Sequence, residues 1–551
     1  MPSDAERHSD NQTRVRLPRR RFLRATAVGA PFTLAGCLGD DDPDDVTDDT
    51  GDADDDDDVP GDTPSDDGSG DDAIYGGELQ WGGSVPVQSL DPHLESAAAS
   101  SRVLENITEG LVRVNWEYEL EPHLAESWTV SEDQTEIEFA IREGVEFHDG
   151  TELTSADVLA SFERIRDGEM LAAGYFPFIE SMSAPDEHTF SLQLTEPFTP
   201  LLSRMATSEM HIVPESQTDQ SQIEVPIGTG PYEFESRELD AEFVMVRNDD
   251  YWRDEYPYMD RIVKTEIPDD ESRLNSFEAG ELDFVNDVPP RRVTEVEENP
   301  DVEYIERFPQ SLVYLGLNCD EEPFDDLDAR LALDYAIDKE DVVEAALYGN
   351  GLTTASPAPP GSEWVHPDVD PRPRDVDRAR EHLEAAGYPD GFEASFKIPQ
   401  PYADQVTAAE VIHSQALEVG IELNIEQITW SNWLSDVWTD RNFQATTSSY
   451  LALWYPDAAF HRFLHPDGAF FFTGWDDDEY NELIEDARQA FDIEQRADLY
   501  HEATEILQER RSGHLLLYWM PNMMARYPQF NGEIMSPDGS TFRFEDTWLD
   551  Q

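Results

Sequence analysis

Three groups of residues have types and spacings that could support chemistry. His461 and His465 are four residues apart, a spacing that would place both imidazoles on one face of a helix, where they could hold a metal ion. His148 and Asp149 could act together as an acid–base pair. Residues 228–230, Gly-Thr-Gly, have the small side chains of a phosphate-binding turn. Each group also has a structural interpretation.

We expect a structural role for all three groups. No third His or Cys accompanies the histidine pair, although Asp457 lies one turn earlier, so a solvated helix face without a metal is the favoured interpretation. His148 and Asp149 lie in a turn bounded by glycines. No Lys-Ser/Thr follows residues 228–230, whose glycines are expected to supply special backbone angles in a tight turn. With no G-x-S-x-G, H-E-x-x-H or P-loop motif in the sequence, we expect no catalytic residue and no cofactor.

The N-terminus has the layout of an export signal, predicted over residues 1–37. A basic segment is followed by residues 25–35, a small and apolar run that is too short to cross a membrane permanently as a helix. Residues 19–23, Arg-Arg-Arg-Phe-Leu, resemble a twin-arginine signal, with Pro18 where that pattern has Ser or Thr. Residues 34–37, Leu-Ala-Gly-Cys, resemble a lipobox, in which Cys37 is lipidated and becomes the mature N-terminus. An N-terminal helix, or a basic tail beside an ordinary cysteine, is the alternative.

The next segment, residues 38–73, is predicted to be a disordered tether. Residues 40–72 contain 18 Asp and no Lys or Arg, so the segment repels itself and has almost nothing apolar to bury. A calcium-binding tail is the alternative, but the run lacks the spaced ligands and the Gly turn of a calcium loop. We therefore expect a folded domain that this tether holds away from the membrane.

The net charge of −84 indicates a protein from an extreme halophile. Residues 1–37 carry seven Arg against three Asp and Glu, and the tether carries 18 Asp, so the rest of the chain still carries −70. Only three lysines occur, Lys264, Lys339 and Lys397, against 34 Arg. Such a domain repels itself in dilute buffer, whereas molar salt shortens the screening length to about 3 Å. The acidic surface also excludes nucleic acid as a partner.

The folded part begins near Ile74 and spans roughly 480 residues, enough for two or three domains of an α/β class. Alternating apolar residues predict a strand over 137–141, and a capping box at 154–157 begins a helix. Further helices are expected over 327–337, 338–347 and 375–386, and strands over 312–317 and 444–453. Cys319 follows one of these strands and is expected near the core, because Cys37 is assigned to the lipid and no disulfide framework remains.

A series of short motifs runs along the folded part in a fixed order. They are Leu-Ala-Glu-Ser-Trp at 124–128, Gly-Val-Glu-Phe-His-Asp-Gly at 144–150, Pro-Ile-Gly-Thr-Gly-Pro-Tyr at 226–232, Asp-Tyr-Trp at 250–252, Ala-Gly-Glu-Leu-Asp at 279–283, Tyr-Leu-Gly-Leu-Asn at 314–318, the segment 330–338, and Ala-Gly-Tyr-Pro-Asp-Gly at 386–391. In this order they resemble the extracellular solute-binding proteins of the peptide/nickel type (family 5, dipeptide/oligopeptide-binding type). Members of that family deliver ligands to ABC importers.

The resemblance implies a two-lobed, periplasmic-binding-protein-like fold of type II with an additional α+β domain inserted in lobe one. Ligand would be buried between lobes that close like a hinge, and the permease would recognise the closed form. The implied segments are 76–110 and 206–305 for lobe one, 111–205 for the extra domain, 306–518 for lobe two and 519–551 for the return to lobe one.

The resemblance also selects ligand-binding positions. Residues 83–85, Gly-Ser-Val, match the loop after the first strand, which faces the cleft in the family and places Ser84 there. Residues 444–457 resemble the family's cleft-facing strand and turn, which selects Tyr450 and Trp454, with Trp433 on the neighbouring helix. Aromatic side chains line small-molecule clefts, although half or more of the aromatic residues in lobe two should belong to the core.

One position departs from the family. Peptide binders carry an acidic residue four positions before the proline of this turn, where it pairs with the amino terminus of the peptide. Counting back from Pro456 gives Ala452, which cannot form this pair. A buried ammonium without a partner costs several kcal/mol. Asp457 could substitute from the other side of the proline if the ligand adopts a different pose. The ligand therefore stays open between a peptide, an oligosaccharide or other organic solute, and a metal complex.

The predicted function is that of a membrane-tethered, extracytoplasmic solute-binding protein. It would be exported by the twin-arginine route, anchored through Cys37 at the extracellular face of the membrane, and would act as a monomer with the permease subunits of an ABC transporter. A cell-surface sensor or adhesion module of the same fold is the second interpretation. An exported hydrolase is the last, because the sequence offers no recognisable nucleophile–base pair.

Overall fold

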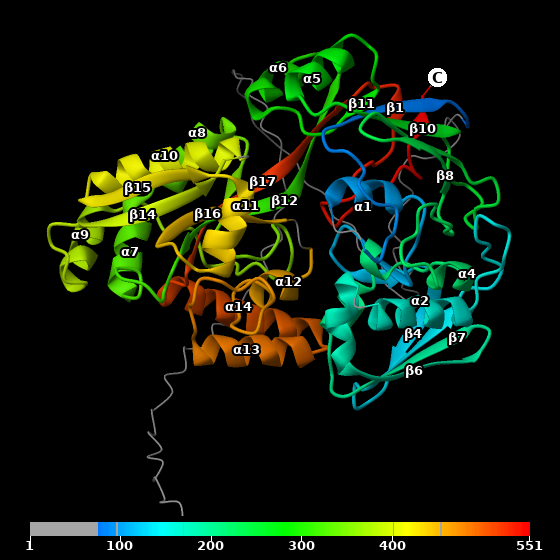
Figure 1. The fold of residues 1–551 in the computed structure, drawn as a ribbon, viewed down its shortest axis with the longest axis horizontal. Coiled ribbons are helices and arrows are strands. Elements are labelled where there is room, and N and C mark those ends of the chain that lie inside the picture. The colour runs from blue at the N-terminus through cyan, green and yellow to red at the C-terminus, as the bar shows by residue number, and fades with distance from the viewer. Residues whose placement is uncertain (1–74, 95–96, 169, 401, 452–453, 551) are drawn as a thin grey trace, which may run out of the picture. The chain divides into compact units, whose positions relative to one another are not determined.

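The computed structural model describes residues 75–94, 97–168, 170–400, 402–451 and 454–550 (Figure 1). The export signal with Cys37 and the Asp-rich segment lie outside these residues, and so does Ala452. All the described residues belong to one unit of the chain. None of the described helices is both long enough and apolar enough to cross a membrane.

A mixed sheet of 11 strands carries the fold. Its hydrogen-bonded order is β15 (Ile421–Ile428), β14 (Phe392–Pro399), β16 (Ala445–Leu451), β12 (Glu303–Leu317), β17 (His514–Arg526), β11 (Phe284–Val285), β1 (Glu78–Gly83), β10 (Arg261–Glu266), β9 (Glu242–Arg247) and β8 (Tyr232–Glu238), while β13 (Leu352–Thr353) pairs with β17 beside this path. We call the part from β11 to β8, with its attached helices, lobe one, and the part from β15 to β16 lobe two. The long strands β12 and β17 belong to both.

Strand directions place the functional edges of the two lobes opposite each other. β12 runs antiparallel to β16 and β17, and β17 runs antiparallel to β11, so β11 points the same way as β12 and β16 points the opposite way. β1 and β10 are parallel to β11, and β14 and β15 are parallel to β16. β11 pairs with β17 at the level where β12 begins, and the last residue of β16 lies opposite Ser311, near the middle of β12. The carboxyl ends of the parallel strands of both lobes therefore point toward the middle of β12.

Helices cover the sheet of lobe two, and several of them begin at aspartate residues whose side chains cap the first turn. The helices are α7 (Leu327–Ala336), α8 (Lys339–Leu347), α9 (Val376–Ala385) and α10 (Ala403–Leu417), and α13 (Asp478–Gln489) and α14 (Ile493–Glu509) pack together as a separate pair. The side chain of Asp338 caps α8 and that of Asp375 caps α9, so the helices expected over 338–347 and 375–386 are confirmed. The strand expected over 312–317 is confirmed as the end of β12, and the one expected over 444–453 is confirmed as β16 as far as 451, since residues 452 and 453 lie outside the described residues.

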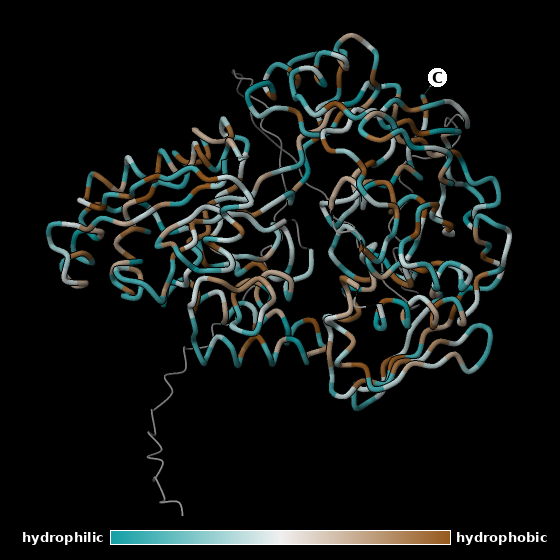
Figure 2. The backbone as a smooth tube through the Cα atoms, viewed as in Figure 1, coloured by the Kyte–Doolittle hydropathy of each residue, from teal (hydrophilic) through white to brown (hydrophobic). Residues whose placement is uncertain are grey.

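The extra domain has its own sheet and core. Its four strands are ordered β4 (Ala125–Val130), β5 (Glu136–Ile141), β7 (Thr189–Leu194) and β6 (Ile179–Asp186), and β2 (Val112–Val114) pairs with β3 (Leu120–Pro122) beside it. Helix α2 (Ser155–Asp167) packs on the sheet, where Phe162 meets Phe190 with ring centroids 5.2 Å apart. Asp157 accepts a hydrogen bond from the backbone N–H of Thr154 over 2.9 Å, which confirms the predicted capping box. Hydrophobic residues gather along these strands (Figure 2).

The remaining elements are short and mostly belong to lobe one and the connections. They are α1 (Ala98–Leu104), α3 (Pro200–Arg204), α4 (Glu215–Thr218), α5 (Asp270–Glu278), α6 (Val293–Glu297), α11 (Trp430–Trp433), α12 (Asp457–Phe460), β18 (Phe530–Asn531), β19 (Trp548–Leu549), three 3-10 turns at Leu171–Phe178, Ser208–Met210 and Pro290–Arg292, and a π-helical segment at Leu434–Thr439. The sequence boundaries at 305/306 and 518/519 fall inside β12 and β17.

The Gly-Thr-Gly segment joins the extra domain to lobe one. The backbone N–H of Gly230 donates to the Ile107 carbonyl. The backbone N–H of His148 donates to the Gly228 carbonyl, Nδ1 of its ring accepts from the Gly228 N–H, and Nε2 bonds the Gly230 carbonyl. The prediction of special backbone angles is wrong, since neither glycine has a positive φ. The glycines are needed because a Cβ on Gly228 would lie 1.9 Å from the Ile107 carbonyl oxygen, and one on Gly230 would lie 2.6 Å from that of Asn106. His148 thus has a structural role, as the sequence predicts.

Substitution of Gly228 by alanine is expected to lower the free energy of unfolding by about 3 kcal/mol, because the added methyl group overlaps a backbone oxygen that cannot move aside. Gly174→Ala is the matched control, since no atom lies within 4 Å of a Cβ at that position and its φ is not positive. Urea unfolding of both variants at molar salt measures the difference. Equal stability of the two variants would contradict the steric explanation.

Candidate functional site

The carboxyl edges of the two sets of parallel strands are the places where this fold can bind a ligand. In open α/β sheets, ligands sit outside the carboxyl ends of the strands, because the loops there are free to vary. In lobe one the edge comprises the loops after β1, β10 and β11, and in lobe two those after β14, β15 and β16.

On lobe one, a polar cluster is centred on Asp287, just after β11. The Ser84 hydroxyl, in the loop after β1, donates a hydrogen bond to Oδ2 of Asp287, and the side-chain amide of Asn286 donates to the same oxygen. Gln310 of β12 donates from Nε2 to Oδ1 over 3.2 Å. Ser84, which the sequence places at the cleft, therefore orients a carboxylate at this edge.

The Asp287 carboxylate is ionised at neutral pH. Burial raises its pKa, but the guanidinium of Arg102, 3.9 Å from Oδ2, and the hydrogen bond from Ser84 act in the other direction, and the pKa lies below its ordinary value. The side chain nevertheless keeps 27% of its surface exposed. The edge of lobe one thus presents a negative charge that is held in place and still reachable.

On lobe two, two exposed aromatic side chains stand at the carboxyl edge. Trp430 follows β15 and begins α11, and Tyr402 follows β14. Their rings meet edge to face with centroids 5.7 Å apart, and they are 39% and 38% exposed. Trp430 also stacks on Trp433, with centroids 5.0 Å apart. An exposed pair of this kind offers a ligand apolar area with a polar edge.

Two aromatic residues that the sequence selects, Trp433 and Tyr450, lie in the core beneath this edge. Trp433 is 2% exposed, and its indole nitrogen donates to the Thr446 hydroxyl over 2.8 Å. Tyr450 is 1% exposed, and its hydroxyl group bonds the ring of His514. Sequence reasoning named the inner tryptophan of the stacked pair and missed the outer one, Trp430. The three-residue spacing between the two tryptophans could have indicated Trp430, because it lets one indole ring stack on the other.

The turn after β16 is buried against the extra domain. Trp454 and Tyr455 belong to the hydrophobic core of that domain, and the Tyr455 hydroxyl accepts a hydrogen bond from Arg204 over 3.0 Å. Asp457 is 6% exposed and forms an ion pair with Nε of Arg488 at 2.9 Å. Burial raises the pKa of Asp457, and Arg488 opposes this rise. The Asp457 carboxylate is thereby engaged inside the protein.

Arg488 connects this turn to the extra domain. Its backbone carbonyl accepts hydrogen bonds from the backbone N–H and the hydroxyl of Thr199, at 2.8 and 3.1 Å. Its guanidinium lies over the Phe198 ring, 5.0 Å from the centroid. Cation–π contacts of this kind gain strength where water is excluded. The ion pair of Asp457 therefore supports the contact between lobe two and the extra domain.

Among the described residues, one group of three side chains could supply metal ligands: His461, His465 and Glu485. Nε2 of the two histidines lies 3.4 and 3.7 Å from Oε1 of Glu485, and Arg488 donates to that oxygen over 2.9 Å. The backbone N–H of Asp467 donates to Nδ1 of His465, which leaves the proton of a neutral ring on Nε2, where a metal would need a lone pair. This bonding favours ion pairing of the two rings with Glu485 over a metal site.

The prediction that the histidine pair lies on a solvated helix face is wrong. Helix α12 ends at Phe460, and residues 461–464 form turns. His465 is 5% exposed, and its ring stacks on that of His461 with centroids 4.6 Å apart. Glu485 comes from α13, so the sequence spacing of the pair gave no sign of this partner.

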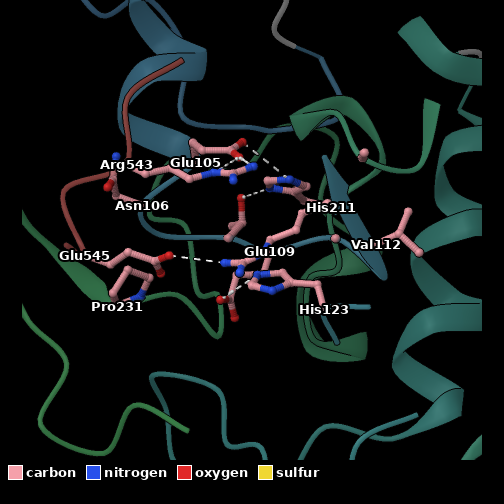
Figure 3. Close-up of a pocket in the computed structure, with 13 residues that line it drawn as sticks. Glu105, Asn106, Glu109, Val112, His123, His211, Pro231, Arg543 and Glu545 are labelled. Carbon is pink, nitrogen blue, oxygen red and sulfur yellow. Dashed lines mark hydrogen bonds and ion pairs between the residues drawn. The ribbon is translucent and has the colours of Figure 1, made fainter. Parts of the chain in front are cut away.

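A buried polar cluster joins the extra domain to lobe one (Figure 3). Glu109 pairs with His123 at 2.9 Å, as Figure 3 shows. Glu109 also accepts hydrogen bonds from Thr229 over 2.6 Å and Trp252 over 3.0 Å. Burial raises the pKa of Glu109, but His123 and these hydrogen bonds more than offset it and hold the pKa at about 2. The cluster encloses a cavity of about 20 Å³, enough for one water molecule. This cluster is a joint between domains and too small to take a solute.

Comparison with known proteins identifies the family of the chain. The model of the bacterial extracellular solute-binding proteins, family 5 (middle region), matches residues 119–471. Heme-binding protein A of Haemophilus influenzae is 26% identical over 465 residues, 76% of this chain and 83% of that protein. Glutathione-binding protein GsiB of Escherichia coli is 28% identical over 343 residues, 61% of this chain and 67% of that protein.

The fold has solved counterparts. The ABC transporter-associated periplasmic binding protein DppA of Helicobacter pylori, solved in complex with the peptide STSA, matches with a TM-score of 0.73 at 24% sequence identity. The match covers 87% of this chain and 99% of that one. The two chains therefore share the lobes and the extra domain as one architecture.

Proposed function

Because the chain belongs to family 5 of the bacterial extracellular solute-binding proteins, we propose that it captures a peptide or another small organic solute between its lobes and delivers it to an ABC import permease. The fold expected from the sequence, two lobes of type II with an additional α+β domain, is confirmed. Members of this family are binding proteins and not enzymes, so the site is interpreted as a binding site.

One observation carries the proposal for the site. The carboxyl edges of both lobes point toward the middle of β12, and each edge carries a different kind of ligand-binding group. Lobe one presents the Asp287 carboxylate, and lobe two presents the aromatic pair Tyr402 and Trp430. A solute held between them would meet a charged acceptor on one side and flat apolar surface on the other, a combination that gives small-molecule sites orientation and affinity.

The residues selected from the sequence take supporting roles in this proposal. Ser84 orients Asp287, and Trp433 backs the exposed face of Trp430. Tyr450 holds the core under the same edge, while Trp454 and Asp457 secure lobe two against the extra domain. Substitutions of these residues would then change ligand affinity indirectly, by shifting the groups at the two edges.

The cellular setting is part of the proposal and rests on the sequence. The twin-arginine pattern, the lipobox at Cys37 and the Asp-rich segment that follows support export and a lipid anchor at the extracellular face, with the chain acting as a monomer. The excess of carboxylates supports a site that works at molar salt. The names of the three relatives described above specify heme, glutathione and a peptide, which supports an organic solute in this chain.

Equilibrium dialysis of the full chain at molar KCl against pooled tetrapeptides and pooled oligosaccharides tests the proposal. The wild type is expected to retain members of one pool. Trp430→Ala should weaken that binding by about tenfold or more, because an aromatic contact at a desolvated site carries on the order of 1.5 kcal/mol or more.

Trp116→Ala is the matched control for loss of an exposed tryptophan. Trp116 lies in the turn between β2 and β3 and is 45% exposed, close to the 39% of Trp430. Binding by this variant should equal that of the wild type. Retention of neither pool by the wild type, or equal binding by the Trp430 and Trp116 variants, would count against the proposed site.

A further inference from the structure

The Asp287 carboxylate has one acceptor position that the protein does not fill. An ionised carboxylate offers about four lone-pair directions, two on each oxygen. Oδ2 accepts hydrogen bonds from Ser84 and Asn286, and Oδ1 accepts one from Gln310. Arg102 approaches Oδ2 only to 3.9 Å, and it is engaged elsewhere, with Nε donating to a backbone oxygen and the guanidinium over a phenylalanine ring. The remaining position is therefore on Oδ1.

The backbone at Asp287 holds the side chain in this orientation. Its φ of 57° is left-handed, a conformation that L-residues adopt rarely and Asp and Asn more readily than most. Arg273 donates to the Asp287 carbonyl over 2.7 Å, and the Trp81 indole donates to the side-chain oxygen of the preceding Asn286 over 2.8 Å. Both anchors are buried, so the carboxylate is positioned before any ligand arrives.

The location of Asp287 is right for a contact with solute. It follows β11 at the carboxyl edge of lobe one, and its partner Gln310 lies in β12 one residue before the level at which β16 ends. More than a quarter of the side chain is exposed. Asp457, the carboxylate that the sequence offers in lobe two, is instead buried against Arg488. Of these two carboxylates, only Asp287 is within reach of a ligand.

We propose that Asp287 binds a primary ammonium group of the solute through Oδ1, which in a peptide is the α-amino group. An acceptor-only group needs a donor, and a charged N–H donor forms a stronger hydrogen bond with a carboxylate than a neutral hydroxyl does. The inference rests on the proposed function, because it names the group of the captured solute that lobe one recognises.

The test compares two probes, tetra-alanine with a free amino terminus and N-acetyl-tetra-alanine, by calorimetric titration of the full chain at molar KCl. The wild type is expected to bind the free peptide about tenfold to a hundredfold more tightly than the acetylated one. Asp287→Asn should lose this preference, weakening the free peptide by a similar factor and leaving the acetylated peptide unchanged. Asparagine keeps the size of the side chain and tolerates a positive φ, so this variant preserves the backbone.

Asp249→Asn is the control for removal of one negative charge. Its side chain is 84% exposed and pairs with Arg247 on lobe one. This variant should bind both peptides as the wild type does. An equal loss for both peptides in Asp287→Asn, or equal wild-type affinity for the two, would overturn the inference and leave solute capture standing. A wild type that binds neither peptide but retains an oligosaccharide would overturn the inference and the peptide assignment together.

Discussion

Replacement of Asp334 by asparagine is expected to lower the free energy of unfolding by about 3–5 kcal/mol, the range for breaking a buried ion pair. Asp334 lies in α7, is 0% exposed, and pairs with three cations: Lys339 at 2.9 Å, Arg372 at 2.8 Å and Arg511 at 3.3 Å. The variant would leave these cations in lobe two without their shared anion. Urea unfolding at molar salt measures the loss.

Asp377→Asn is the matched control for Asp334→Asn. Asp377 lies in α9, its side chain is 96% exposed, and Arg380 stands 3.7 Å away. Exposed pairs of this kind contribute little, so this variant should match the wild type within about 0.5 kcal/mol. Comparable losses in the two variants would show that the Asp334 cluster does not hold lobe two together.

The same cluster predicts a dependence of stability on acid. Burial raises the pKa of Asp334, but Arg511, Lys339 and Arg372 more than offset it and hold the pKa at about 2. An unfolded Asp has a pKa of about 3.9, so the unfolded state binds this proton more strongly. The stabilisation is therefore complete above about pH 4 and is lost as the pH falls through about 2. Asp334→Asn should lack this part of the acid sensitivity.

The unfolding temperature of the chain is expected to rise on the order of 10 °C between about 0.1 M and about 3 M KCl. The Debye length is about 10 Å at the lower concentration and below about 3 Å at the higher one, so repulsion among surface carboxylates is largely screened at high salt. With an unfolding entropy of about 2.1 cal/mol/K per residue over roughly 480 folded residues, a shift of this size corresponds to a gain of about 10 kcal/mol in unfolding free energy.

The three lysines are buried, so they do not offset the negative charge of the surface. Lys264, Lys339 and Lys397, the only three in the sequence, are 1%, 6% and 7% exposed. Each forms an ion pair, at 2.7, 2.9 and 3.2 Å respectively. Lysine therefore contributes almost nothing to the surface, and arginine and histidine are left to balance the carboxylates there.

Sucrose at matched osmolality separates screening from a general effect of solutes, since it carries no charge and should raise the unfolding temperature far less than KCl does. An unfolding temperature that is the same at both KCl concentrations would contradict the halophilic interpretation. It would leave the fold and the binding site unaffected.

The elements of the fold could be predicted where the signal is local. The caps at Asp338, Asp375 and Thr154 satisfy orphan N–H groups within the same turn, so the sequence alone locates the helices that they begin. The position of Gly228 was predicted to be structural, but the reason was wrong. The backbone oxygen that excludes a side chain belongs to Ile107, far away in the sequence, which no local pattern reveals.

The site could be predicted only in part, because burial depends on distant segments. Trp454 and Asp457 were predicted to contact a ligand. In the structure they lie instead beside Phe198 of the extra domain and Arg488 of α13. Asp287 could not be selected from the sequence alone. It follows β11 at the carboxyl edge of a strand parallel to β1, and that pairing becomes visible only once the sheet order is known.

The measurement that tests solute capture most directly is mass spectrometry of what the full chain releases on denaturation after purification at molar KCl from its own host. The proposed function predicts about one small organic solute per chain, and the further inference predicts that this solute carries a primary amine. Trp430→Ala should release much less of it than Trp116→Ala does. A wild type that releases no small molecule, and retains none of the pooled peptides and oligosaccharides, would contradict the claim that this chain is a solute-binding protein.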